Sequence, residues 1–235
     1  SYKLNGKKKL DYLRNAKLVA EELMDNYNRF GITKYYFLDD TFNDSNSKLE
    51  ALHSEITKLP FKIEFWTYLR ADLLARYPEQ MKLMKEMGLR HAFFGIETFN
   101  NDSGKAVHKG SDREKMKTFL ENLHDNEDTV SINIGLIAGL PYDSEKNIID
   151  TIEYTKIFTK WPIHYSVLGF QFHLEEKSEM SKDPQKYGYT FDNKGWINNR
   201  GLTQEQAIQT LRKHKTPNII VNTLTTKSND DEIKI

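Results

Sequence analysis

The sequence predicts an α/β fold, a partial (β/α) TIM-like barrel of parallel strands, from three observations. Short apolar runs typical of strands buried on both faces recur along the 235-residue chain. Segments with apolar residues at steps of three and four, the spacing of an amphipathic helix, alternate with these runs. Polar residues follow nearly every run and no glycine-rich phosphate loop is present, which favours a barrel over an open doubly wound sheet.

The first predicted helix covers residues 11–30, and Gly31 is placed to end it. A regular βα unit begins with a strand, so we expect the barrel's first strand to lie upstream and to be missing from this chain. The apolar run at 35–38 predicts the next strand, which stops on two adjacent carboxylates, Asp39 and Asp40.

The later elements follow the same pattern. Further strands are predicted at residues 61–69, 89–96, 130–140 and 164–172. The helices between them are predicted to begin at Ser45 or Ser47, at Pro78, at a capping box of Ser111 and Glu114, and at Ser144. We therefore expect a barrel domain over residues 1–173.

Residues 174–235 are expected to form a C-terminal extension with a final helix capped at Thr203. The extension contains a long polar segment whose aromatic residues cluster between 187 and 196. Such a segment is either a functional loop that contributes substrate specificity or a surface loop pinned by its own aromatic side chains.

Composition restricts the function classes. The 34 basic and 34 acidic residues balance, which argues against a dedicated nucleic-acid binder, although a modified RNA substrate stays open. No apolar run approaches the ~20 residues that cross a bilayer, and no signal peptide is visible, so we expect no membrane partner and a cytoplasmic location. The chain has no cysteine, so none of its residues can serve in thiolate catalysis or ligate a zinc ion or iron–sulfur cluster through sulfur.

Polar or glycine residues at the strand ends form the candidate site, because the carboxyl ends of parallel strands meet at one rim. In chain order they are Asp39, Asp40, Arg70, Glu97, Thr98, Asn133, Gly135, Gly139 and His173, and apolar Leu140 beside Gly139 is included with them. Adjacent carboxylates suit an ammonium group or a divalent cation, Arg70 suits a carboxylate, and Glu97 could accept hydrogen bonds from sugar hydroxyls. Glycines would let a flat ring approach the backbone closely. Such a site fits an amino-acid nucleoside.

The same residues carry a family resemblance over about residues 34–155. The motifs are Phe37-Leu-Asp-Asp-Thr-Phe42, Leu69-Arg-Ala-Asp72, Met84-Lys-Glu-Met-Gly88, Phe94-Gly-Ile-Glu97, Lys109-Gly110 and Ala138-Gly-Leu-Pro141. In this order and spacing they resemble the motifs of radical S-adenosylmethionine (radical SAM) enzymes. The likeness is greatest to the branch with the cobalamin-binding-domain and methylthiotransferase types.

The resemblance implies a barrel that binds S-adenosylmethionine (SAM) on a [4Fe-4S] cluster. It also implies reductive cleavage to a 5′-deoxyadenosyl radical, hydrogen abstraction from an unknown substrate, a reductant such as flavodoxin or ferredoxin and, in part of the branch, cobalamin. By position, Asp39 or Asp40 would hold the methionyl amino group. Arg70 would lie near the methionyl carboxylate and Glu97 near the ribose. The stretch 135–141 would line the adenine, and His173 would face the substrate or adenine.

One departure from the family is plain, because the Cys-x-x-x-Cys-x-x-Cys loop that ligates the cluster is absent. We expect the chain to begin just after that loop, so that this fragment alone would be inactive. The alternatives are a catalytically inactive barrel that binds a nucleoside or a partner, and a metal-dependent lyase or hydrolase. The latter would use Asp39, Asp40, Glu97 and His173 as ligands.

Overall fold

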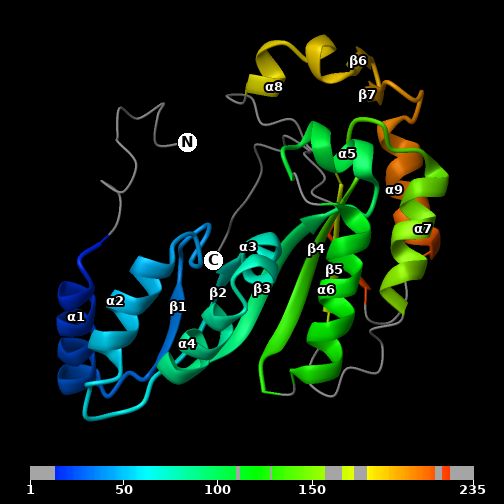
Figure 1. Ribbon diagram of the computed structural model, residues 1–235. Coiled ribbons are helices and arrows are strands. Elements are labelled where there is room, and N and C mark those ends of the chain that lie inside the picture. Colours follow the sequence, from blue (N-terminus) through cyan, green and yellow to red (C-terminus); the bar gives the residue numbers. More distant parts are fainter. Residues whose placement is uncertain are drawn as a thin grey trace. The chain divides into compact units, whose positions relative to one another are not determined.

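A computed structural model describes residues 14–109, 112–127, 129–156, 166–171, 179–214 and 219–222 (Figure 1). The chain divides into two compact units, and the division falls within strands β3 and β4. The first unit contains residues 1–95, 118–133 and 162–164, and the second contains residues 96–117, 134–161 and 165–235. His173 lies outside the described residues.

The elements alternate along the chain as the sequence predicts. The first part runs α1 (Ala16–Phe30), β1 (Lys34–Phe37), α2 (Asn46–Ile56), β2 (Glu64–Leu69), α3 (Ala71–Arg76), α4 (Glu79–Met87) and β3 (Leu89–Glu97). The middle part runs α5 (Asn101–Ala106), α6 (Arg113–Asn126), β4 (Ser131–Ala138), α7 (Glu145–Thr155) and β5 (Ser166–Gln171). The last part runs α8 (Glu179–Lys182), η2 (Gln185–Tyr187), β6 (Tyr189–Asp192), β7 (Gly195–Asn198), α9 (Gln204–His214) and β8 (Ile219–Asn222).

The main sheet has the strand order β1-β2-β3-β4-β5-β8, and the pairs β1–β2, β2–β3 and β5–β8 are parallel. The order follows the chain, so each crossover moves in the same direction along the sheet. A strand order that follows the chain is that of a (β/α) barrel, whereas a doubly wound sheet reverses direction at a switch point. The predicted fold class, an α/β partial barrel of parallel strands, is confirmed.

In the first unit, one face of the sheet is packed and the other is partly open. Alternate residues of β2 and β3 are buried, including Phe65, Leu69 and Phe94. The residues between them point to the opposite face, where Trp66 stands with its ring centroid 4.2 Å from that of Tyr36. Because side chains alternate across a strand, this second face presents aromatic rings at the positions that the packed face leaves out.

Most predicted helix ends are confirmed by their hydrogen bonds. Gly31 ends α1 in the left-handed conformation, with φ of 66°. Ser45 caps α2, and Ser144 forms a capping box with Asn147 at the start of α7. The predicted box at the start of α6 is wrong in its capping residue, because Asp112 accepts hydrogen bonds from the first amides there.

The long polar segment of the extension is folded. Strands β6 and β7 form an antiparallel hairpin in which Tyr189 pairs with Asn198 and Phe191 with Trp196. The short helices, this hairpin and β8 were not predicted, because segments of three to six residues rarely show a clear period. Within the described part of the chain, no helix is long and apolar enough to span a bilayer.

Candidate functional site

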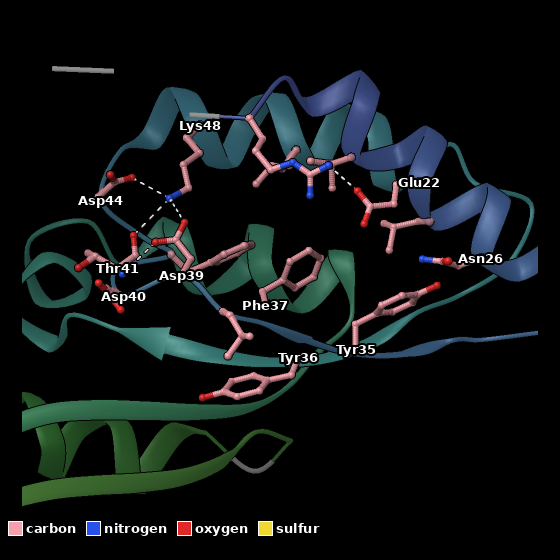
Figure 2. Close-up of a pocket in the computed structure, with 16 residues that line it drawn as sticks. Glu22, Asn26, Tyr35, Tyr36, Phe37, Asp39, Asp40, Thr41, Asp44 and Lys48 are labelled. Atoms are coloured by element: carbon pink, nitrogen blue, oxygen red, sulfur yellow. Dashed lines mark hydrogen bonds and ion pairs between the residues drawn. The ribbon is translucent and has the colours of Figure 1, made fainter. Parts of the chain in front are cut away.

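The first unit has a cavity of about 620 Å³ beside the end of β1 (Figure 2). Its walls are the turn that follows β1, the facing side of α1, and side chains of α2. Asp39 and Asp40 line it, as does Lys48 of α2. The structure thus places both predicted carboxylates beside this cavity and adds a lysine ammonium close to Asp39.

Asp39 already binds an ammonium group of its own chain. Its carboxylate accepts a hydrogen bond from the backbone amide of Thr41 at 3.0 Å and one from Lys48 Nζ at 2.9 Å. Lys48 Nζ also contacts Asp44 at 3.0 Å and the Thr41 carbonyl at 3.2 Å, so its three donors are all used (Figure 2). The side chain of Lys48 is only 8% exposed, and a buried ammonium needs such partners. Asp39 thus fixes the turn.

Asp40 has a different environment. It is exposed at the cavity. Among the described residues, no hydrogen bond or ion pair involves its carboxylate. Of the two adjacent carboxylates, Asp40 is therefore the one that a ligand could engage without displacing an existing partner.

Arg70, at the end of β2, is paired with a neighbouring carboxylate. Its Nε donates to Asp72 Oδ1 at 3.0 Å, and its NH2 donates to Asp72 Oδ2 at 2.6 Å. This is the bidentate geometry in which guanidinium groups recognise carboxylates. Arg70 was predicted to bind a carboxylate, and in the structure it binds the carboxylate of Asp72. A ligand carboxylate would have to share the guanidinium with Asp72 or displace Asp72.

A buried amide network connects the ends of β1 and β2. Asn43, fully buried in the turn after β1, accepts a hydrogen bond from the Arg70 amide at 2.8 Å and donates to the Arg70 carbonyl at 3.1 Å. Gln80 of α4 donates to the Asn43 carbonyl at 3.3 Å and to Asn46 at 2.7 Å. These contacts set the position of Arg70 relative to the turn. The sequence did not reveal the roles of Asn43 and Gln80, because a polar residue in a turn or in the first turn of a helix is normally expected to be exposed.

Two predicted residues lie within β4 and not at its end. Asn133 is half-buried at the third position of the strand, and Gly135 is buried two residues later. Only Gly139 and Leu140 follow the end of the strand. A side chain in the middle of a strand is removed from the rim by about 3.3 Å per residue, so these two positions differ from the others in depth.

In the second unit, Glu97 ends β3 and pairs with Lys109 Nζ at 3.1 Å. Glu97 has a φ of 67°, a backbone conformation that residues with a side chain rarely adopt. The neighbouring Thr98 is buried and its hydroxyl accepts a hydrogen bond from the Asn100 amide at 3.0 Å. The Thr98 hydroxyl therefore has a hydrogen-bond partner in the local backbone, whereas the Glu97 carboxylate at the end of β3 is paired with a lysine.

Arg113 stabilises the backbone around Glu97 and Lys109. Its guanidinium is buried and donates to the carbonyls of Ile96 at 3.2 Å, Thr98 at 3.0 Å and Lys109. Gly104 lies against it, and a Cβ at that position would meet the guanidinium at 3.1 Å. One buried cation thus fixes both the backbone around Glu97 and the loop that carries Lys109.

Two buried side chains fix the turn that follows β4, residues 139–143: Asp143, which belongs to the turn, and Asn198 of β7. Asp143 accepts hydrogen bonds from the amides of Gly139 and Leu140, both at 3.2 Å, and from Ser103 Oγ at 2.8 Å. Asn198 Nδ2 donates to the carbonyl of Leu140 at 3.0 Å and to that of Asp143 at 2.9 Å. Burial raises the pKa of Asp143 to about 6, and these hydrogen bonds offset only part of that effect.

A flat ring does approach Gly139 closely, as its lack of a side chain predicts, and the ring belongs to the chain itself. A Cβ on Gly139 would lie 2.2 Å from the Trp196 ring. The Tyr189 hydroxyl donates to the Gly139 carbonyl at 2.8 Å, and burial, with the nearby Asp143, raises the pKa of Tyr189. Two aromatic residues of the extension, Tyr189 and Trp196, are therefore buried against this turn.

The residues present do not provide an iron–sulfur site. All 235 residues lack cysteine, so no thiolate of this chain can ligate a [4Fe-4S] cluster. Within the described ranges, no group of three or more acidic or histidine side chains could hold a metal ion. The predicted alternative of a metal-dependent lyase or hydrolase thus lacks a ligand cluster among the residues that the structure describes.

Comparison with known proteins shows several likenesses. The TsrM methyltransferase of Kitasatospora setae, a radical S-adenosylmethionine enzyme solved with cobalamin and a [4Fe-4S] cluster, is 13% identical with a TM-score of 0.68. That match covers 94% of this chain and 50% of TsrM. Coproporphyrinogen III oxidase (HemN) from Escherichia coli, a radical SAM enzyme, is 15% identical with a TM-score of 0.53, covering 86% of this chain and 47% of HemN.

The cobalamin-dependent S-adenosylmethionine radical enzyme OxsB, solved with aqua-cobalamin and S-adenosylmethionine, is 14% identical with a TM-score of 0.52. The match covers 74% of this chain and 26% of OxsB. The chain thus spans half or less of the length of these solved proteins, and identities this low show a shared fold alone. No curated protein matches the sequence.

The decisive match is to a family. The family model of the radical SAM superfamily matches residues 5–155. This range is more than half of the chain and includes the predicted motifs from Phe37 to Pro141. The family expectation that the sequence motifs raised is confirmed, and the chain belongs to the radical SAM superfamily.

Proposed function

We propose that this chain supplies the SAM-binding part of a radical SAM enzyme. The observation that carries the proposal is the family match over residues 5–155, and the sequential parallel sheet with polar residues after its strands supports it. The reaction is the reductive cleavage of SAM to methionine and a 5′-deoxyadenosyl radical, which removes a hydrogen atom from a substrate. The cleavage consumes one electron, which a [4Fe-4S] cluster ligated by residues outside this sequence would have to supply. The thiolates for that cluster are not among these 235 residues.

In the first unit, we assign the methionyl ammonium to Asp40 and the methionyl carboxylate to Arg70. Asp40 is exposed and has no partner among the described residues, whereas Asp39 is engaged by Lys48. The Arg70 side chain is 42% exposed, so a ligand carboxylate can reach its guanidinium beside Asp72. The role of Asp39 is then to hold the turn that presents Asp40.

In the second unit, we assign the ribose hydroxyls to Glu97 and the adenine to the backbone of the turn at Gly139 and Leu140. The carboxyl oxygens of Glu97 can accept hydrogen bonds from both ribose hydroxyls. The amides of Gly139 and Leu140 are used by Asp143 and their carbonyls by Tyr189 and Asn198. Adenine contact would therefore use the second lone pairs of those carbonyls. Asn133, Gly135 and Thr98 are proposed as supporting residues.

The test is cleavage of SAM by the protein that carries this chain, anaerobically, with its cluster reconstituted and dithionite as reductant. Release of 5′-deoxyadenosine and methionine in equal amounts is expected, and Glu97→Gln should lower the rate at least tenfold. Glu50→Gln, an exposed carboxylate on α2, is the matched control and should leave it unchanged. A cluster-loaded protein that releases no 5′-deoxyadenosine would refute the proposal.

A second function, a catalytically inactive barrel that binds a nucleoside or a partner, is favoured by one observation. The chain has no cysteine, while its strand-end ion pairs are intact. A protein that binds SAM but takes up no iron, with no absorbance of a cluster in the visible range, would establish this second function.

A further inference from the structure

A groove in the second unit gathers exposed cations. It has a volume of about 780 Å³ and lies between α5, the turn after β4, and the extension residues around Tyr187 and Arg200. Three basic side chains line it, Lys105, Lys186 and Arg200, against one carboxylate, Asp102. The chain as a whole is neutral, so this excess of positive charge is local to the groove.

These three cations are not neutralised within the described part of the chain. No ion pair joins Lys105, Lys186 or Arg200 to a carboxylate there. Lys48 and Lys109, in contrast, form ion pairs with carboxylates of the candidate site. Like charges gathered without partners raise the local potential, which a bound anion would lower. The groove is therefore complementary to an anionic ligand.

Two tyrosines add flat faces to the same groove. The Tyr187 ring lies 5.7 Å from Lys186 Nζ, and Tyr142 is 42% exposed. The backbone at Tyr142 is held at a φ of 66° by hydrogen bonds that fix both its amide and its carbonyl. Asn199 accepts from the amide at 2.7 Å, and Asn100 donates to the carbonyl at 3.2 Å. A residue with a side chain keeps such a conformation only where its surroundings impose it, so Tyr142 is a fixed, exposed aromatic residue of the groove wall.

We propose that this groove binds a short segment of single-stranded nucleic acid. A positively charged groove that follows the phosphates, together with aromatic rings on which bases stack, is the combination that binds single strands without sequence preference. The cations alone would suit an acidic peptide equally well. The two tyrosines favour the nucleic acid, since a peptide of acidic side chains has no ring to stack. The proposal is independent of SAM, which carries no phosphate.

Fluorescence anisotropy on the whole 235-residue chain tests this with a labelled oligouridine and a labelled oligoglutamate of equal charge. Oligouridine should bind more tightly than oligoglutamate. The double reversal of Lys186→Glu and Arg200→Glu should weaken oligouridine binding at least tenfold. It should also reduce the slope of log Kd against log salt by about 0.7 for each lost phosphate contact. Lys146→Glu with Lys194→Glu changes the net charge equally at exposed sites outside the groove, and should alter binding less than about twofold.

The tyrosine face has its own variant. Tyr187→Leu should weaken oligouridine about fivefold or more, the range of a lost stacking contact, and leave oligoglutamate unchanged. Equal binding of the two probes, binding unaffected by the groove reversal, or no binding of oligouridine would each overturn the proposal. None of these results would test the SAM-binding proposal. A titration of SAM into the same variants measures SAM binding separately.

Discussion

Asn198→Ala should destabilise the second unit far more than an ordinary surface substitution. Asn198 is 4% exposed and makes four hydrogen bonds to the backbone: two donated to the carbonyls of Leu140 and Asp143, and two accepted from the amides of Arg200 and Leu202. At about 1 kcal/mol for each hydrogen bond, the loss is about 4 kcal/mol. The expected fall in Tm is about 8–16 °C for a chain of this size.

Urea unfolding followed by circular dichroism measures this loss, with Asn193→Ala as control. Asn193 is exposed in the turn of the β6–β7 hairpin, and its truncation should change the free energy of unfolding by less than about 0.5 kcal/mol. Asn198→Asp sharpens the test, because it keeps the acceptor and replaces the donor by an oxygen that faces two carbonyls. Its destabilisation should shrink as the pH falls and the new carboxyl becomes protonated. If Asn198→Ala behaved like Asn193→Ala, the turn at 139–143 would not depend on the hairpin.

Three further perturbations test the same unit. Asp143 has a folded pKa of about 6, above its ordinary value of 3.8, so the free energy of unfolding should fall as pH rises from about 4 to 6 and stay level above; Asp143→Asn should abolish that slope in pH-dependent urea melts. Gly139→Ala should destabilise by roughly 2–4 kcal/mol, because φ is 96° and the new Cβ would meet Trp196; Trp196→Ala added to it should recover part of the loss, and strictly additive effects would contradict the contact. Arg113→Met should cost about 3–5 kcal/mol by leaving buried carbonyls unpaired, whereas Lys115→Met on the exposed side of α6 should be nearly neutral in the same melts; comparable losses would refute the role of Arg113.

The strands and helix ends could be predicted because each depends on local signals. Apolar runs predicted β1 to β5 to within a few residues. Ser45 and Ser144 cap the starts of α2 and α7 through their side chains, and Gly31, which has no side chain, ends α1. The hairpin β6–β7 escaped prediction because its polar strands are stabilised mainly by buried rings that pack on a distant turn.

The candidate site could be predicted in its residues and not in its partners. Asp39, Arg70 and Glu97 do end strands. Arg70 pairs locally with Asp72, two residues later, whereas the partners of Asp39 and Glu97, Lys48 and Lys109, lie nine and twelve residues further along the chain, and their pairing depends on how the chain folds. The ring over Gly139 shows the same limit. Glycine predicts a close approach by a flat group, while only the fold determines that this group is Trp196.

The most direct test of the central claim is calorimetric titration of SAM into the protein that carries this chain, with its cluster reconstituted anaerobically, and into its Asp40→Asn and Arg70→Met variants. Glu50→Gln is the control, since Glu50 is exposed on α2. We expect the parent chain to bind SAM, each site variant to bind it at least tenfold more weakly, and Glu50→Gln to bind it as the parent chain does. SAM binding that is unchanged in both site variants would contradict the assignment of these strand-end residues, and an absence of binding to the parent chain would contradict the claim itself.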